Sequence, residues 1–167
     1  MHYRIQPAAV GDAAVTVPGD KSVSHRAIML GSIAEGITEV SGFLAGEDCL
    51  ATMSAFRSMG VTIERPAETQ LVVHGVGLHG LQAPGADLDL GNSGTAMRLM
   101  AGVLAGQDFT TTLTGDASLT GRPMQRVITP LTRMGADIES RDGKPPLRIR
   151  GNPRLEGIDY PLPMASA

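Results

Sequence analysis

Aromatic residues are scarce in this sequence: tryptophan is absent, and 167 residues include only two tyrosines and three phenylalanines. This composition leaves no platform of rings on which nucleic-acid bases could stack. The net charge of −3 also argues against a general nucleic-acid binder, because such proteins carry an excess of lysine and arginine. Any site for an anionic ligand must therefore be local.

Cysteine and long apolar runs are also scarce. Cys49 is the only cysteine, which excludes an internal disulfide and indicates a reducing compartment. No apolar run approaches the roughly 18 residues of a membrane span, and the first residues lack the apolar core of a secretion signal. The histidines and the cysteine show no metal-ligand spacing. We expect a soluble, cytoplasmic protein with no metal, no cofactor and no membrane partner.

Glycine, in contrast, is abundant, and part of the sequence is repeated. The 21 glycines follow no collagen-like period, so they indicate tight turns and close backbone approaches. Residues 56–64 (FRSMGVTIE) return as residues 131–139 (LTRMGADIE), an offset of 75 from Met59 to Met134. The flanking segments 15–19 and 71–75 match 88–92 and 147–151 in the same order. We interpret this as two copies of one ancestral unit rather than a chance similarity.

Each copy predicts the order strand, helix, strand, helix, strand, strand, which is an α/β (α+β) fold of βαβαββ units. Asp48 suits the N-cap of the second helix, Gly60 suits the left-handed position after it, and Pro123 suits the first position of the corresponding helix in the second copy. The expected elements of the first copy are strands at 15–17, 38–42, 61–65 and 70–74 and helices at 22–34 and 48–59. In the second copy we expect helices at 93–104 and from Pro123 to Gly135.

These patterns divide the chain into four parts. We expect a first strand at 1–14 that belongs to another lobe, a first unit at 15–85, a second unit at 86–158, and the start of a third unit at 159–167. The last residues are small and apolar where another helix should begin. We therefore expect a partial chain, although a natural terminus packed on a partner is the alternative.

Three strand-to-helix turns are candidate anion sites: residues 18–22 (PGDKS), 91–95 (GNSGT) and 163–166 (PMAS). A helix N-terminus exposes unpaired N–H groups and the positive end of its dipole, glycine permits close approach, and serine adds a hydroxyl. Neither a P-loop nor a dinucleotide-binding glycine pattern is present. Since such strings often serve only as helix caps, none of the three turns is specific by itself.

Basic side chains accompany these turns. Lysine offers a mobile charge and a transferable proton, whereas arginine offers a rigid fork for a carboxylate or a phosphate. The cations are Lys21, Arg26, Arg98 and Arg122. We interpret Arg98 as a structural arginine that ties two lobes together, Asp116 as a cap on backbone N–H groups, and His25 as a surface residue or one behind the site.

Four segments together resemble the enolpyruvyl transferases, specifically the 5-enolpyruvylshikimate-3-phosphate (EPSP) synthase family: residues 18–26 (PGDKSVSHR), 90–98 (LGNSGTAMR), 115–124 (GDASLTGRPM) and 163–167 (PMASA). The resemblance covers the whole chain in the correct order. It implies two lobes of three βαβαββ units with pseudo-threefold symmetry. It also implies transfer of the enolpyruvyl group of phosphoenolpyruvate to the 5-hydroxyl of shikimate 3-phosphate, with release of phosphate.

The resemblance further implies roles for individual residues. Lys21 would contact both substrates and take part in proton transfer as the catalytic residue. Shikimate 3-phosphate would be held by Ser22, Arg26 and Ser166, and phosphoenolpyruvate by Gly94 and Arg122. The family's remaining catalytic groups come from a later half of the chain, so we expect that half as a partner and no turnover by these 167 residues alone.

Two alternatives remain open. UDP-N-acetylglucosamine enolpyruvyl transferases form a sibling family, but they carry Lys-Asn in the first turn, where this chain has Lys21 and Ser22. Most of them also place a cysteine in the loop that corresponds to residues 115–121, which has none here. The second alternative is a non-catalytic binding module of the same fold, and the retained Lys21, Arg26 and Arg122 argue against it.

Overall fold

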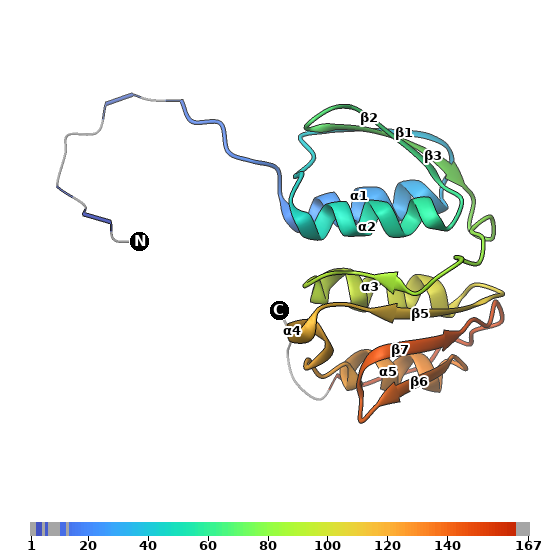
Figure 1. Cartoon of the computed structure of the whole chain (residues 1–167). Helices are drawn as coiled ribbons and strands as arrows, with labels where there is room; N and C mark the ends of the chain where they lie inside the picture. Colours follow the sequence, from blue (N-terminus) through green and yellow to red (C-terminus); the bar gives the residue numbers. More distant parts are fainter. Residues whose placement is uncertain (1–2, 5, 7–10, 13, 163–167) are drawn as a thin grey trace.

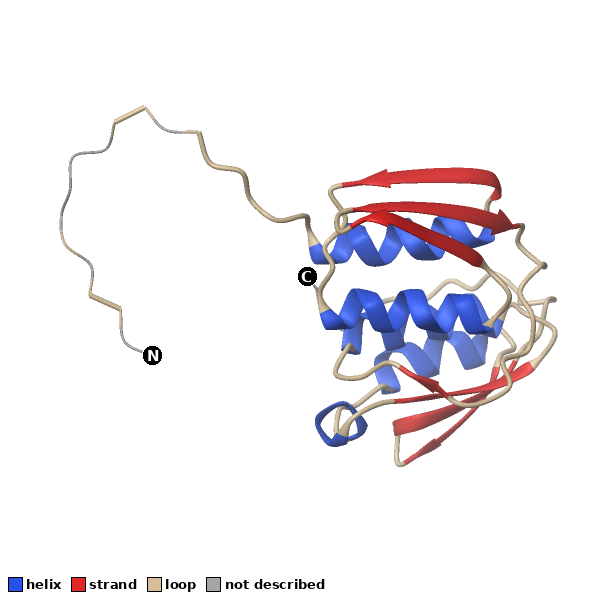
Figure 2. Ribbon diagram, turned by 45° about the horizontal axis from the view of Figure 1, so that its top comes forward, coloured by secondary structure: helices blue, strands red, loops and turns tan. Residues whose placement is uncertain are grey.

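The computed structural model, which describes residues 3–4, 6, 11–12 and 14–162, has two β-sheets with helices packed between them (Figures 1 and 2). The first sheet has the strand order β1-β3-β2, and the second has the order β4-β5-β7-β6. The strands are β1 (Glu35–Ser41), β2 (Thr62–Ala67), β3 (Gln70–Val76), β4 (Leu88–Asp89), β5 (Thr110–Thr114), β6 (Asp137–Arg141) and β7 (Lys144–Arg150). Apart from β4, the two sheets share one arrangement, as expected for a repeated sequence.

The helices of the described residues are α1 (Lys21–Ile33), α2 (Glu47–Ser58), α3 (Gly94–Ala105), the short α4 (Ala117–Thr120) and α5 (Gln125–Arg133). Helices and strands follow one another in the chain in the order α1, β1, α2, β2, β3, β4, α3, β5, α4, α5, β6, β7. Pairing is antiparallel in β1-β3-β2 and in β5-β7-β6, whereas β4 runs parallel to β5. The chain therefore enters α3 from a strand that lies at the edge of the second sheet.

A single hydrophobic core fills the space between the sheets and the helices. Residues of β7 alternate between exposed and buried, as the two-residue period of a strand dictates. Side chains from both copies of the repeat belong to the core, including the fully buried Phe43, Phe56, Ile28, Met59, Leu71, Met97, Met100, Leu104, Leu113 and Met124. The core is aliphatic and methionine-rich because the sequence supplies few aromatic rings.

Most of the expected elements are confirmed, with ends displaced by a few residues. Gly60 follows α2 with a φ angle of +89°, which confirms its left-handed position, and Gly135, the expected end of α5, follows that helix with a φ angle of +98°. Two further expectations are wrong. The N-cap of α2 is Gly46, and Asp48 lies inside the first helical turn. Helix α5 begins at Gln125, with Met124 as its N-cap, rather than at Pro123, and a separate short helix, α4, precedes it.

The expected strand at residues 15–17 is also wrong. These residues have no regular structure, and Val15 and Val17 are 82% and 74% exposed. Their counterpart in the second copy is β4, which pairs with β5. A strand needs a hydrogen-bonded neighbour, and none of the described residues offers one to 15–17. The division into a first strand at 1–14, units at 15–85 and 86–158, and the start of a third unit at 159–167 stays a prediction, and residues 163–167 lie outside the described residues.

None of the described helices is long and apolar enough to span a membrane.

Candidate functional site

Helix α1 begins with a capped turn that presents Lys21. The carboxylate of Asp20 accepts a hydrogen bond from the Val23 N–H at 2.7 Å, which satisfies one of the free donors of the first turn. The ammonium group of Lys21 forms an ion pair with Asp48 in the first turn of α2. The Lys21 side chain is half exposed, so its charge remains accessible to a ligand while Asp48 orients it.

Ser22 and Arg26 lie on the exposed side of the same helix start. The guanidinium of Arg26 donates a hydrogen bond to the main-chain carbonyl of Ser22 at 3.1 Å. The structure therefore brings three of the expected site residues, Lys21, Ser22 and Arg26, together within two turns of α1.

Helix α3 begins in a second capped turn. The hydroxyl of Ser93 accepts a hydrogen bond from the Ala96 N–H at 3.2 Å, and Gly94, the first helical residue, is buried. A Cβ atom at Gly94 would lie 2.7 Å from the guanidinium of Arg98 and 2.9 Å from that of Arg122. Glycine at this position therefore leaves room for the tips of two arginines.

Arg98 and Arg122 differ in what they bond. Arg98 donates to the carbonyl oxygens of Gly94 at 3.0 Å and Pro123 at 3.4 Å, so it braces the start of α3, and its expected contact with a second lobe stays a prediction. Arg122 instead donates to the side-chain oxygen of Asn92. Its guanidinium is therefore held by a neutral group, which leaves its positive charge without an acidic partner in that bond.

Asn92 connects Arg122 to Asp116. Its amide donates to the Asp116 carboxylate at 2.7 Å, and the other oxygen of this carboxylate accepts from the Leu119 N–H at 2.7 Å. The expected role of Asp116 as a backbone cap, here on α4, is thereby confirmed. The hydrogen bond from Asn92, together with that from Leu119, lowers the pKa of Asp116, so this carboxylate is charged at neutral pH.

His25 places the two helix starts side by side. Its Nδ1 lies 2.8 Å from the Thr52 hydroxyl, and its Nε2 lies 3.5 Å from the Ser93 hydroxyl. The ring is fully buried, which excludes the first of the two expected roles, a surface residue, and agrees with the second, a residue behind the site. Burial lowers the pKa of His25, an effect that Asp48 opposes and that Lys21 and Arg26 reinforce.

Cys49 is a packing residue at the same end of the molecule. The thiol is buried, and its Sγ lies 3.7 Å from the main-chain oxygen of Lys21. Burial and the nearby Asp48 charge raise the pKa of the thiol, which keeps it protonated and unreactive. Cys49 is therefore not a candidate nucleophile.

Sequence reasoning missed two residues of this candidate site. Asp48 was assigned to a helix cap, and Asn92 was part of a glycine-rich string without a role of its own. Each bonds a cation 27 or 30 positions away, a contact for which the local sequence carries no signal. Ser166 lies outside the described residues.

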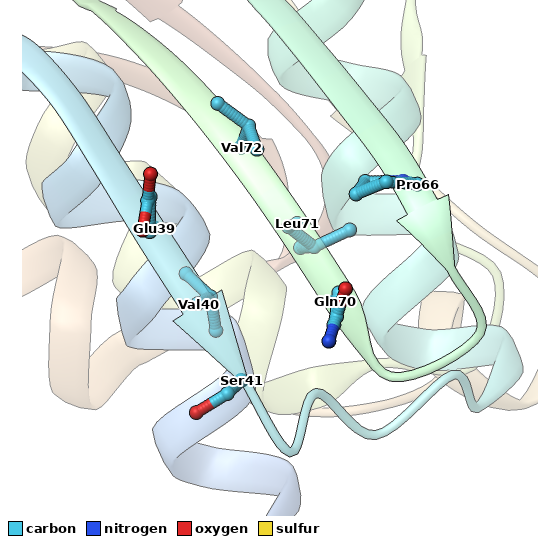
Figure 3. A pocket seen from close by; sticks show the side chains of 7 residues that line it. All are labelled: Glu39, Val40, Ser41, Pro66, Gln70, Leu71 and Val72. Atoms are coloured by element: carbon cyan, nitrogen blue, oxygen red, sulfur yellow. The ribbon is translucent and has the colours of Figure 1, made fainter.

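A separate pocket lies against the first sheet, between residues of β1, β2 and β3 (Figure 3). Its seven lining residues include the acidic Glu39 and the polar Ser41 and Gln70, but no cation. This lining lacks the positive groups that would hold a phosphate or a carboxylate. The helix starts, with Lys21, Arg26 and Arg122, therefore form the better candidate for an anion site.

Comparisons with known proteins identify the family of this chain. The family model of EPSP synthase (3-phosphoshikimate 1-carboxyvinyltransferase) matches residues 6–167. A 3-phosphoshikimate 1-carboxyvinyltransferase of Methylococcus capsulatus is 68% identical over 154 residues, or 92% of this chain and 35% of the relative. That of Hydrogenovibrio crunogenus is 60% identical over 168 residues, which cover 100% of this chain and 38% of the relative.

A solved structure shows the same arrangement. EPSP synthase from Acinetobacter baumannii superposes with a TM-score of 0.87 at 59% identity, over 92% of this chain and 35% of that chain. The chain thus spans little more than a third of the length of these relatives. The model match over nearly all residues and the structural likeness show that the chain belongs to the EPSP synthase family.

Proposed function

We propose that this chain is the N-terminal portion of an enzyme that transfers the enolpyruvyl group of phosphoenolpyruvate to the 5-hydroxyl of shikimate 3-phosphate and releases phosphate. Both substrates carry phosphate, and phosphoenolpyruvate also carries a carboxylate. Helix starts with adjacent cations bind such groups. Membership of the family and the grouping of Lys21, Ser22 and Arg26 on α1 support this proposal.

One observation carries the proposal: the starts of α1 and α3 are neighbours. Lys21 precedes His25 by about one helical turn. His25 in turn lies 3.5 Å from Ser93, the residue before Gly94. Gly94 is flanked by the guanidinium of Arg122. Lys21 can therefore lie between a ligand on α1 and a second ligand at α3, as a residue that contacts both substrates must.

The proposed division of work follows from these positions. Ser22 and Arg26, together with Ser166, hold shikimate 3-phosphate, whereas Gly94 and Arg122 hold phosphoenolpyruvate. Lys21 contacts both substrates and moves a proton during addition. Preorganised cations stabilise a transition state in which charge shifts between carboxylate and phosphate, because they need no reorganisation at that moment.

Titration with shikimate 3-phosphate tests the proposal, with Lys21→Met compared against Lys144→Met. These are the only two lysines, and Lys144 lies exposed on β7, so both variants lose one positive charge. Loss of a charged hydrogen bond costs about 1.5–3 kcal/mol, so Lys21→Met should weaken binding about 10- to 100-fold. Lys144→Met should bind like the parent.

Two results would contradict the proposal. One is equal affinity of the Lys21→Met and Lys144→Met variants for shikimate 3-phosphate. The other is preferential binding of UDP-N-acetylglucosamine, which would move the chain to the sibling specificity. Unfolding of each variant is measured in parallel. The partly exposed Lys21–Asp48 pair contributes about 1 kcal/mol to stability, so the Lys21→Met chain should remain folded.

A further inference from the structure

His25 connects three helices that carry or support the proposed site. The residue belongs to α1, its Nδ1 lies 2.8 Å from Thr52 of α2, and its Nε2 lies 3.5 Å from Ser93, the N-cap of α3. All three side chains are buried, with exposures of 0%, 0% and 1%. A buried polar group without a partner is costly, so these hydroxyls and this ring constrain one another.

The other hydrogen bonds of Thr52 and Ser93 determine where the hydrogens lie between these two hydroxyls and the His25 ring. The Thr52 hydroxyl donates to the Asp48 carbonyl at 3.2 Å, so its oxygen is left to accept from Nδ1–H of His25. The Ser93 oxygen accepts from the Ala96 N–H, so its hydroxyl hydrogen is left to point to Nε2. Every donor then has an acceptor if the imidazole is neutral and carries its hydrogen on Nδ1.

We infer that His25, as a neutral imidazole protonated on Nδ1, is a positioning residue that fixes the N-cap Ser93, and with it the start of α3, against α1 and α2. The inference deepens the proposed function, on which its relevance to ligand binding rests. Ser93 sets the first turn of α3, and Gly94 and the tips of Arg98 and Arg122 follow directly from that turn. His25 itself touches no ligand in this role.

The surroundings of the ring favour the neutral form. The positive charges of Lys21 and Arg26 on α1 disfavour a protonated His25 ring, whereas the negative charge of Asp48 on α2 favours it. Helix α3 contributes only the uncharged Ser93. Burial is the largest influence and lowers the pKa of His25 below its ordinary value of 6.5. The unfolded chain therefore binds this proton more tightly, and the stabilisation through His25 is complete above pH 6.5 and declines as the pH falls further.

Nitrogen-15 NMR of the histidine rings in the full chain tests the assignment directly. We expect His25 to carry hydrogen on Nδ1 near neutral pH, the tautomer less common in free histidine. Ser93→Ala should shift the Nε2 resonance of His25, and Thr52→Val should shift the Nδ1 resonance.

The position of α3 is tested by the backbone amide signals of Gly94 and Ala96. These signals should move in the His25→Phe variant but not in the control His79→Phe, because His79 is exposed. The inference would be overturned if His25 carried its hydrogen on Nε2. It would also be overturned if the Gly94 and Ala96 amide signals did not move in a folded His25→Phe variant.

Two further measurements separate positioning from simple packing. The difference in Tm between the parent and His25→Phe should shrink between about pH 7.5 and about pH 5.5, since only the parent loses this stabilisation on acidification. A Tm difference that stays constant over this pH range would contradict the inference.

The second measurement is the affinity for inorganic phosphate at the start of α3. This affinity should fall about fivefold in Ser93→Ala, the effect of one lost hydrogen bond. If the parent binds no phosphate, the proposed function fails at this site, while the ring tautomer still decides the role of His25. If Ser93→Ala fails to fold, the tautomer of the parent is decisive by itself.

Discussion

At the scale of the residue, Gly94 allows ligand binding and stability to be separated. An alanine Cβ would meet the guanidinium tips of Arg98 and Arg122, which can move because they end flexible side chains. We predict that Gly94→Ala leaves the free energy of unfolding unchanged or raises it by up to about 1 kcal/mol, since alanine favours helices. Phosphoenolpyruvate affinity should fall about tenfold, because Arg122 is displaced. Urea denaturation and a binding titration measure both quantities.

The matched control for Gly94 is Gly102, in the same helix. A Cβ there meets nothing within 4 Å, so Gly102→Ala should change stability in the same direction without changing affinity. Unaltered phosphoenolpyruvate binding by Gly94→Ala would remove Gly94 from the proposed site.

Individual roles could be predicted from sequence only where the partner is near in the chain. Asp116 caps Leu119 three residues away, and this role was predicted correctly. The contact of His25 with Ser93 spans 68 residues, and the bond of Arg122 to Asn92 spans 30. Such contacts depend on how the helices pack, which no local pattern encodes. The motifs therefore indicated the cations of the proposed site but not the groups that hold them.

At the scale of the element, α1 and β3 approach each other closely at Gly75. A Cβ there would collide with the carbonyl of Ala34 and lie 2.6 Å from that of Gly31, two backbone atoms near the end of α1. Backbone cannot yield as a side-chain tip can. We predict that Gly75→Ala lowers the free energy of unfolding by about 1–3 kcal/mol, the usual cost of overpacking. Urea denaturation measures the loss, with Gly157→Ala, where a Cβ meets nothing within 4 Å, as the control. Equal midpoints for the two variants would contradict the expected clash.

The elements themselves follow from periodicity and from glycine positions, but their pairing does not. Residues 15–17 and β4 precede equivalent helices and show similar apolar alternation. Leu88 of β4 is 3% exposed and pairs with β5, whereas Val15 is 82% exposed. β4 forms a strand because β5 lies beside it and provides hydrogen-bond partners. An isolated extended segment cannot form these hydrogen bonds within itself, and residues 15–17 have no such neighbour among the described residues. Strand identity was therefore predictable for β1 to β3 and wrong for 15–17.

At the scale of the whole molecule, the two sheets share one core. Helix α3 contacts α1 and α2, strand β4 contacts α2, and the buried side chains of both repeats form one cluster. A chain with one core of this size should unfold as one cooperative unit. A cavity made beside one sheet should then weaken the other sheet equally, which separate cores would not allow.

Phe56→Ala tests this coupling. Phe56 is fully buried in α2, so its truncation should lower the free energy of unfolding by about 3–5 kcal/mol. Ile149 belongs to β7 in the other sheet, and its amide should lose the same protection from hydrogen exchange if exchange there needs global unfolding. The control Val15→Ala changes an exposed side chain and should alter neither quantity. If Ile149 kept its protection while α2 lost it, the sheets would unfold separately, and the site between α1 and α3 would depend on docking of two independent folding units.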